Sequence, residues 1–223
     1  METLGKLFNS QTRVKVMRLF LLNSETCYDA KDVAQRSKST PPAARRELAV
    51  LAAADFIKKK TFIKEIHLSS GKHKKKKVSG WQLNATLPYL EALRNLLVDS
   101  NTMDRSEIMR RFKGVGKIKL FVIAGIFTKD SDSRLDVMIV GDNLKRNLIE
   151  RSLHTLESEL GRELSYALFD TPEFVYRLNM YDKLIADVLD FPHETLVNSL
   201  NVIAQSPKKP EVGYPYHSPV ELV

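Results

Sequence analysis

The stretch YDAKDVAQRSKSTPPAARRELAVLAAADF, residues 28–56, decides the fold of the first half of the chain. Asp29 and Thr40 are of the residue types that cap helices with a side-chain oxygen, and proline directly after Thr40 loses no hydrogen bond at a first helical position. Beyond it, alanine and leucine recur at spacings of four and three residues, which places them on one helical face. The stretch therefore predicts two helices, over 29–36 and 40–54, joined by a tight turn.

The continuation IKKKTFIKEIHLSSGKHKKKKVSGWQL, residues 57–83, has a different pattern. Two runs with β-branched and aromatic residues predict strands over 61–67 and 77–83. The segment 69–77 between them carries a glycine and a cluster of lysines, which predicts a turn with concentrated positive charge. Such a cluster by itself is most simply a solvated loop. Trp81, in the second strand, is expected to pack in the core beneath the hairpin.

A tight pair of helices followed by a basic hairpin is the layout of a winged helix–turn–helix, a module that reads double-stranded DNA. An earlier helix, predicted over 11–22, would complete its three-helix core. The candidate DNA contacts lie at the start of the second helix, on its side away from the apolar face, and on the hairpin. They are Lys38, Ser39, Thr40, Arg45, Arg46, Lys72, His73, Lys74, Lys75, Lys76 and Lys77.

The distribution of charge agrees with this interpretation. Residues 1–100 hold 19 Lys and Arg against 9 Asp and Glu, a net charge of +10. Residues 101–223 hold 16 against 18, a net charge of −2. Since each phosphate that a protein neutralises releases counterions, the excess in the first half favours a nucleic-acid partner for that half.

Composition also indicates a compartment. The single cysteine, Cys27, excludes an internal disulfide and is typical of a reducing compartment, so a cytoplasmic protein is expected. The apolar run around residues 19–22 is too short to span a bilayer, and no secretory signal is recognisable. The histidines show no metal-ligand spacing, and we expect neither a metal nor a cofactor.

The predicted linker, residues 84–102, contains a helix over 88–98 with an apolar seam. Leu90, Leu93 and Leu97 recur along it at spacings of three and four. The seam could pack on its own domain or pair with a second copy of the chain. A homodimer is expected, because regulators of this kind set two reading helices against two half-sites.

The second half alternates predicted strands and helices, which indicates an α/β unit with a small mixed sheet and an α+β class for the whole chain. The first domain is expected over 1–83, the second over 103–200, and a mobile tail over 201–223. The predicted strands cover 117–124, 135–140 and 163–169; the predicted helices cover 103–112, a segment capped by Asp142 or Asn143 and ended by Gly161, a segment from Thr171, and 181–189.

A family resemblance supports the prediction of an α/β unit in the second half of the chain. The segments GIF (125–127), SRLDVMIVGD (133–142), LESELGRELSY (156–166) and TPEFVYRL (171–178) resemble a minimal nucleotidyltransferase of the DNA polymerase β-like superfamily, over about residues 108–200. Bacterial and archaeal chains that join such a domain to an N-terminal winged helix are usually described as transcriptional regulators. The resemblance therefore implies the same fold and a regulatory role here.

The active-site motif is degenerate. Active members carry Gly-Ser and then Asp-x-Asp, whose carboxylates hold two metal ions. Here Gly125 matches the glycine, but Ile126 replaces the serine, Arg134 replaces the first Asp, and only Asp136 matches the second. A third acid is expected near Ser165, where a hydroxyl stands. One carboxylate beside an arginine cannot hold two metals, so Asp136 is expected to be structural or to pair with Arg134.

The sequence thus predicts a DNA-binding transcriptional regulator whose inactive second domain senses, dimerises or contacts a partner. A nucleotide effector fits, because Gly125, Lys129 and Arg134 could still meet phosphates. Two alternatives stay open. One is an active nucleotidyltransferase that modifies a protein or RNA. The other is a protein-interaction module without DNA binding.

Overall fold

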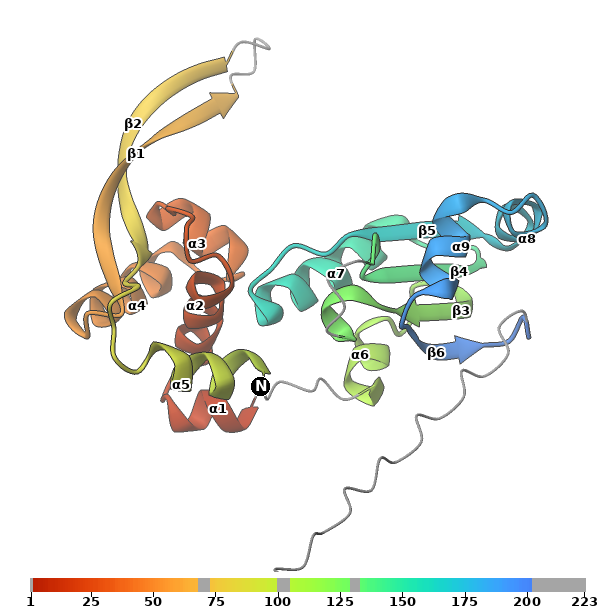
Figure 1. Cartoon of the computed structure of the whole chain (residues 1–223), viewed down its shortest axis with the longest axis horizontal. Helices are drawn as coiled ribbons and strands as arrows, with labels where there is room; N and C mark the ends of the chain where they lie inside the picture. Colours follow the sequence, from red (N-terminus) through yellow and green to blue (C-terminus); the bar gives the residue numbers. More distant parts are fainter. Residues whose placement is uncertain (1, 68–72, 100–104, 129–132, 202–223) are drawn as a thin grey trace, which may run out of the picture.

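The computed structural model describes residues 2–67, 73–99, 105–128 and 133–201. It is a mixed α+β structure with two separate sheets (Figure 1). We call residues 2–99 the helical unit and residues 105–201 the sheet unit. The predicted tail over 201–223 lies, except for residue 201, outside the described residues. Within the described ranges, no helix has both the length and the apolar character needed to cross a bilayer.

The helical unit begins with four helices and continues into a hairpin and a linker helix. Its elements are α1 (Glu2–Leu7), α2 (Gln11–Leu22), α3 (Ala30–Arg36), α4 (Pro41–Ala53), β1 (Ile57–His67), β2 (His73–Leu83), α5 (Leu90–Arg94) and the π-helical turn η1 (Asn95–Asp99).

Local capping explains where α3 and α4 begin. The Asp29 carboxylate accepts hydrogen bonds from the backbone N–H groups of Lys31 and Asp32, each at 2.8 Å, while Asp32 bonds back to the Asp29 N–H. The Thr40 hydroxyl accepts a hydrogen bond from the Ala43 N–H at 3.4 Å. Both predicted caps are confirmed, because capping needs only partners within three residues.

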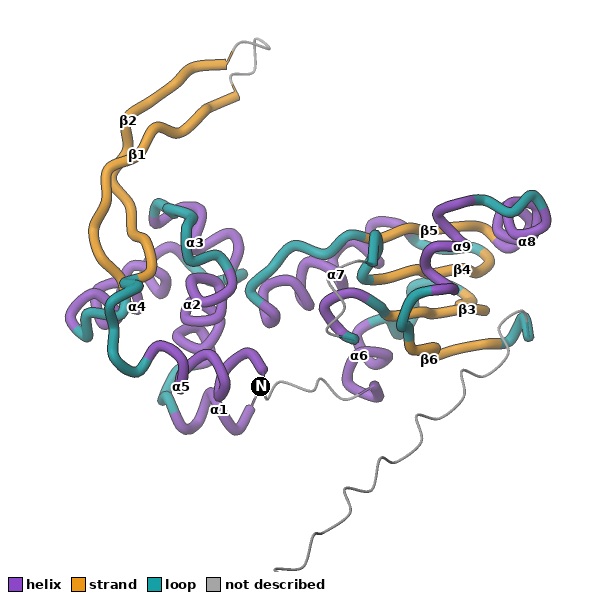
Figure 2. The backbone as a smooth tube through the Cα atoms, in the orientation of Figure 1, coloured by secondary structure: helices purple, strands orange, loops and turns teal. Residues whose placement is uncertain are grey.

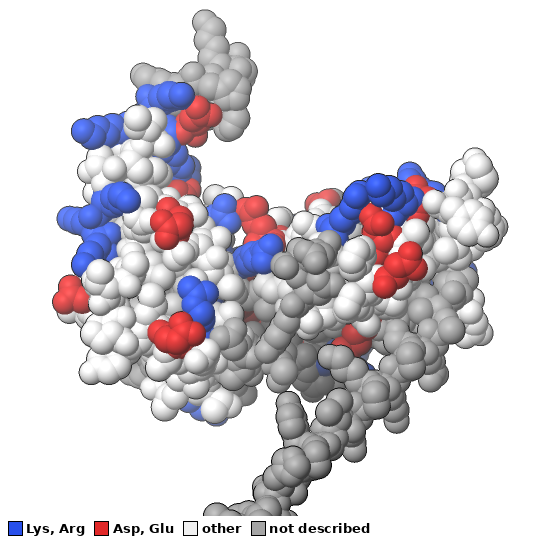
Figure 3. All heavy atoms as spheres, in the orientation of Figure 1, with Lys and Arg blue, Asp and Glu red and all other residues white. Residues whose placement is uncertain are grey.

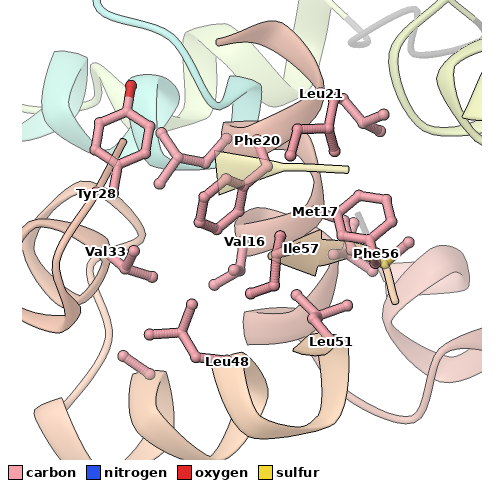
Figure 4. Packing of buried hydrophobic residues seen from close by; sticks show 14 of the residues in the cluster. Val16, Met17, Phe20, Leu21, Tyr28, Val33, Leu48, Leu51, Phe56 and Ile57 are labelled. Carbon is pink, nitrogen blue, oxygen red and sulfur yellow. The ribbon is translucent and has the colours of Figure 1, made fainter. Parts of the chain in front are cut away.

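One apolar cluster holds the helical unit together (Figure 4). Phe20 and Tyr28 meet edge to face with ring centroids 5.7 Å apart. Tyr28 and Trp81 exchange two backbone hydrogen bonds of 2.9 Å, which fasten β2 to the segment before α3. A side chain at Gly80 would bring its Cβ within 2.4 Å of the Tyr28 carbonyl oxygen, so this attachment requires glycine. Trp81 packs, half-buried, against the cluster as predicted.

The hairpin is longer than predicted. β1 and β2 pair antiparallel without interruption from Ile57 opposite Leu83 to His67 opposite His73. The prediction that 69–77 form a turn is therefore wrong for His73–Lys76, which lie within β2; Lys77 lies in β2 as expected from the predicted strand over 77–83. Lysine has a low strand propensity, but a two-stranded ribbon is solvated on its edges and tolerates charged residues there.

The leucine seam of the linker packs on the helical unit itself. Leu97 is fully buried in the cluster, and Leu87, Leu90 and Leu93 pack against its edge, whereas Leu96 is exposed. The seam thus packs on its own unit, which is the first of the two arrangements expected from the sequence.

The sheet unit has four strands in the order β5-β4-β3-β6. β4 and β5 run parallel, and β3 is antiparallel to both β4 and β6. Figure 2 shows the strands side by side with helices packed around them. The elements are α6 (Arg105–Arg111), β3 (Lys117–Ile123), the 3-10 turn η2 (Gly125–Phe127), β4 (Val137–Asp142), α7 (Arg146–Leu160), β5 (Tyr166–Asp170), α8 (Thr171–Asn179), α9 (Lys183–Asp190) and β6 (Glu194–Asn198).

Alternation along the strands builds two apolar layers. Phe121 and Ile139 point to the side covered by α6 and α7, whereas Val122 and Met138 point to the side covered by α8 and α9. Both central strands are buried on both faces, and their continuous apolar runs follow from this position.

The sheet unit differs from the predictions in several places. The strand predicted over 163–169 begins only at Tyr166. α7 begins at Arg146 and is not capped by Asp142 or Asn143. The Asp142 carboxylate instead binds the Lys119 ammonium and the Thr171 hydroxyl, and Asn143 has a φ of 53°. The edge strand β6 was not predicted, since its five half-buried residues carry a weak pattern.

The two units meet where α7 packs on α2. The Arg18 side chain, 1% exposed, donates from Nε to the Leu97 carbonyl oxygen at 2.7 Å and from Nη1 to the Glu159 carbonyl oxygen at 2.8 Å. Lys15 Nζ donates to Ser158 Oγ at 3.2 Å, and Asn23 Nδ2 donates to the Gly161 carbonyl oxygen at 2.9 Å. The last turn of α7 is therefore bound to the helical unit by side chains of α2 and its C-cap.

Gly161 permits this close packing, and a pair of glycine variants tests it. Gly161 and Gly114 both have a φ of 82°, but a Cβ at Gly161 would lie 2.7 Å from the backbone of α2, whereas Gly114 faces open space. We expect Gly114→Ala to cost about 1–2 kcal/mol from the left-handed conformation alone. Gly161→Ala should cost about 2 kcal/mol more, because the backbone of α2 must shift. Urea denaturation measures both, and equal losses would contradict tight packing of α7 on α2.

Candidate nucleic-acid interface

Helix α4 has one buried face and one exposed face. Ala44, Leu48 and Leu51 are buried in the cluster. Glu47 is also buried, and its carboxylate accepts hydrogen bonds from Ser10 Oγ at 2.7 Å and Arg13 Nε at 2.8 Å. These bonds hold α4 on the first turn of α2, so the opposite side of α4 points outward.

That outward side carries the two arginines predicted to contact DNA. Arg45 and Arg46 are both exposed, and among the described residues neither guanidinium has an ion-pair partner. They lie in the second turn of a helix that is held at its N-terminus and along its inner face. The arrangement presents two free guanidinium groups on a rigid element, which suits contact with phosphates or base edges.

The polar side chains of the turn before α4 form hydrogen bonds within the chain. Lys38 has a φ of 50°, and its ammonium donates to the Arg151 carbonyl oxygen at 3.2 Å and to Thr155 Oγ1 at 2.7 Å, both on α7. Ser39 Oγ lies 2.8 Å from Ser37 Oγ. With Thr40 engaged in capping, these three predicted contacts have intramolecular partners, and their role toward DNA stays a prediction.

The hairpin carries its lysines on two exposed strands. Lys75, Lys76 and Lys77 are all exposed, and in the described part of the chain only Lys75 forms an ion pair, with Glu65 at 3.5 Å. The backbones of His73 and Lys74 pair with His67 and Ile66. Lys72 lies outside the described residues. The structure thus places Lys75–Lys77 along one strand of a projecting ribbon.

A second lysine run on the hairpin was missed by the sequence predictions. Lys58, Lys59 and Lys60 are exposed on β1, on the strand opposite Lys75–Lys77 and nearer the base. The signal was available, because three consecutive lysines follow Ile57, but the predicted strand began only at residue 61. Figure 3 shows Lys and Arg side chains along the hairpin on the face in view.

Lys64 fixes the hairpin against α3. Its ammonium binds Asp29 at 2.9 Å and also contacts Asp32. The two carboxylates that cap the start of α3 therefore also bind the hairpin. Partial burial lowers the pKa of Lys64, but hydrogen bonds to Asp32 and Asp29 outweigh it and raise the pKa above its ordinary value. Across the ribbon, Lys64 lies opposite Lys76.

Gly125 and Asp136, which the family resemblance predicts to match a nucleotidyltransferase motif, lie directly against each other. Asp136 is buried, and its carboxylate accepts from the Ile126 N–H at 2.9 Å and from the Ser165 N–H at 2.8 Å. Gly125 has a φ of 54°, and a Cβ there would lie 2.4 Å from Asp136 Oδ1. Asp136 therefore joins η2 to the segment before β5, which is the structural role expected as one of two alternatives.

The other alternative, an ion pair between Asp136 and Arg134, is wrong. Arg134 Nε lies 2.8 Å from Asp187 Oδ2 on α9. Because both oxygens of Asp136 accept hydrogen bonds from backbone N–H groups, Asp136 needs no cation, and Arg134 pairs with Asp187 instead. Lys129 lies outside the described residues. Within the described part of the chain, no three His, Cys, Asp or Glu side chains are grouped so as to hold a metal ion.

Comparisons of the chain with protein-family models, with curated proteins and with solved structures found no match. The function must therefore be inferred from the side chains and their geometry.

Proposed function

We propose that the chain is a regulator that binds double-stranded DNA through a winged helix–turn–helix in its helical unit. The observation that carries this proposal is the joint exposure of Arg45 and Arg46 on α4 and of two lysine runs on the hairpin. In this interpretation α3 and α4 form the helix–turn–helix, α4 enters the major groove, and the β1–β2 ribbon follows the phosphate backbone. A DNA partner and the single Cys27 support a cytoplasmic location.

The α4 arginines provide the first experiment. In Arg45→Ala/Arg46→Ala, affinity for a bound genomic fragment should fall about 10-fold to 100-fold, because each base or phosphate contact is worth about 1 kcal/mol or more. Fluorescence anisotropy on labelled duplexes measures it. The matched control is Arg110→Ala/Arg146→Ala, which removes the same charge from α6 and α7. Equal affinities of the two double variants would reject α4 as the reading helix, whereas no DNA binding by the original chain would favour a protein-interaction module.

For the sheet unit we propose a nucleotidyltransferase-like fold without transfer chemistry. Two-metal catalysis needs several carboxylates open to the metals, and Asp136 has both oxygens engaged by backbone N–H groups. Arg134, in place of the first Asp, pairs with Asp187 and adds positive charge. The sheet unit would then serve to sense, to dimerise or to bind a partner.

An assay with radiolabelled nucleotides tests whether the chain lacks nucleotidyltransferase activity. With each radiolabelled nucleoside triphosphate and Mg²⁺ or Mn²⁺, neither the chain nor RNA or lysate proteins should become labelled. Asp136→Asn is the informative variant, since it keeps one oxygen for a backbone N–H. Metal-dependent labelling that disappears in Asp136→Asn would overturn the proposal and make the chain an enzyme.

A homodimer is part of the proposal, because two reading helices on two half-sites multiply affinity and specificity. The leucine seam does not supply the contact, since its buried members pack within the helical unit. Sedimentation of the free chain and of its DNA complex measures the stoichiometry.

A further inference from the structure

A cavity of about 420 Å³ lies where the two units meet. One wall is the end of α3 and the turn after it, with Arg36 and Lys38; the other wall is the end of α7 and the segment after it, with His154, Glu157, Arg162 and Glu163. Its size is within the range of small-molecule sites. Neither unit alone would form it.

The acidic groups of the cavity are already engaged. Glu157 accepts from the Leu164 N–H at 2.9 Å through Oε1 and contacts His154 Nδ1 at 2.7 Å through Oε2. Glu163 Oε1 pairs with Arg36 Nη1 at 2.9 Å. The carboxylates thus have partners before any ligand arrives.

The cationic groups retain donors. Among the described residues Lys38 binds a carbonyl and a hydroxyl oxygen and no carboxylate, so its charge is not paired with an acid there. Arg162 is exposed and has no ion-pair partner among the described residues. Arg36 uses Nη1 for Glu163 while its guanidinium lies over the Tyr28 ring, 5.3 Å from the centroid. The cavity is therefore lined by three cationic side chains and by two carboxylates that already have partners. Its net charge is positive, and its cationic side chains can donate hydrogen bonds to a ligand.

Apolar side chains complete the lining. Leu19 of α2 and Leu164, both buried, contribute to the cavity. A bare inorganic anion would fill only part of a cavity of about 420 Å³, whereas an organic phosphate could fill it and keep its oxygens on the cations.

We propose that this cavity binds a phosphorylated small molecule of mononucleotide size. The phosphate lies among Arg162, Lys38 and Arg36, and the organic part lies on Leu19 and Leu164. The site is distinct from the Gly125–Asp136 motif, and it does not depend on the proposed DNA binding. Because the ligand contacts both units, it also stabilises their docked arrangement.

Isothermal titration of the full chain tests the proposal with AMP, GMP, CMP, UMP and inorganic phosphate as probes. At least one nucleotide should bind with a Kd below about 100 μM and at least tenfold more tightly than phosphate. Arg162→Gln should weaken that nucleotide at least tenfold while the melting temperature of the free chain stays the same. Arg146→Gln, near the opposite end of α7, and Arg134→Gln, beside the degenerate motif, should bind as the original does.

Three results would overturn the proposal. The first is that no nucleotide binds with a Kd below about 100 μM. The second is equal binding of phosphate and nucleotides, which would reduce the site to a non-selective anion site. The third is loss of binding in Arg134→Gln with Arg162→Gln unaffected, which would move the ligand to the degenerate motif.

Discussion

Replacing Arg18 with alanine should lower the free energy of unfolding by about 3–5 kcal/mol, the largest stability loss that we expect from a charged residue here. The guanidinium is 1% exposed and binds the carbonyl oxygens of Leu97 and Glu159. Its removal leaves two buried acceptors without their donor, at about 1–3 kcal/mol each, and opens a cavity. Burial lowers the pKa of the Arg18 guanidinium, with Glu159 acting in the opposite direction, but an arginine remains protonated.

Two further variants separate the causes. Arg18→Met fills much of the volume but donates nothing, so it should still lose about 2–3 kcal/mol. Arg45→Ala, an exposed arginine of the same unit, should change stability by less than about 0.5 kcal/mol. Urea denaturation followed by circular dichroism measures all three. If Arg18→Met were as stable as the original chain, the hydrogen bonds to the two carbonyl groups would contribute nothing net.

Removing three lysines from the hairpin should have the largest effect on DNA binding. In Lys75→Ala/Lys76→Ala/Lys77→Ala, the slope of log K against log salt should flatten by about 2.7 if each lysine contacts one phosphate. At about 0.1 M salt this corresponds to a loss of two to three orders of magnitude in affinity, for specific and non-specific duplexes alike. Anisotropy titrations between about 50 and 300 mM salt measure both quantities.

The control removes the same charge elsewhere. Lys113, Lys117 and Lys183 are exposed lysines of the sheet unit, and their triple alanine variant keeps the hairpin intact. Its salt slope should match that of the original chain. Two triple variants with the same slope would show that net charge, not the hairpin, drives binding, and Lys75–Lys77 would then be solvated surface.

Much of the helical unit could be predicted because its determinants are local. Asp29 and Thr40 cap α3 and α4 through backbone groups two or three residues away, and Gly161 ends α7 with a φ of 82°. The outward position of Arg45 and Arg46 also follows from periodicity, since residues beside a buried stripe must face away from it. These features need no knowledge of a distant partner.

The length of the hairpin is a feature that local sequence patterns did not predict. Lysines at 74–77 favour a loop by propensity, but pairing with β1 extends the strand through them. The pairing of β1 with β2 adds backbone hydrogen bonds, which the propensity of a single residue does not include. The same pairing places Lys58–Lys60 in β1.

Partners of charged side chains were decided by the tertiary structure. Lys38 reaches Thr155, 117 residues away, and Arg134 pairs with Asp187 although Asp136 is two residues from it. Asp136 satisfies both oxygens with backbone N–H groups, which a sequence does not reveal. The cavity between the units has the same origin, since its walls come from separate parts of the chain.

By itself, the sequence determined the helices α2, α3 and α4, the caps of α3 and α4, the existence of a basic hairpin and the exposed arginines of α4. Only the tertiary structure decided that Arg18 is buried, because its partners are carbonyl groups 79 and 141 residues away. Carbonyl groups near the end of a helix lack intrahelical partners whatever the residue type, so no sequence pattern marks them. Packing of α7 and η1 against α2 brings two of them to one guanidinium and thereby joins the two units.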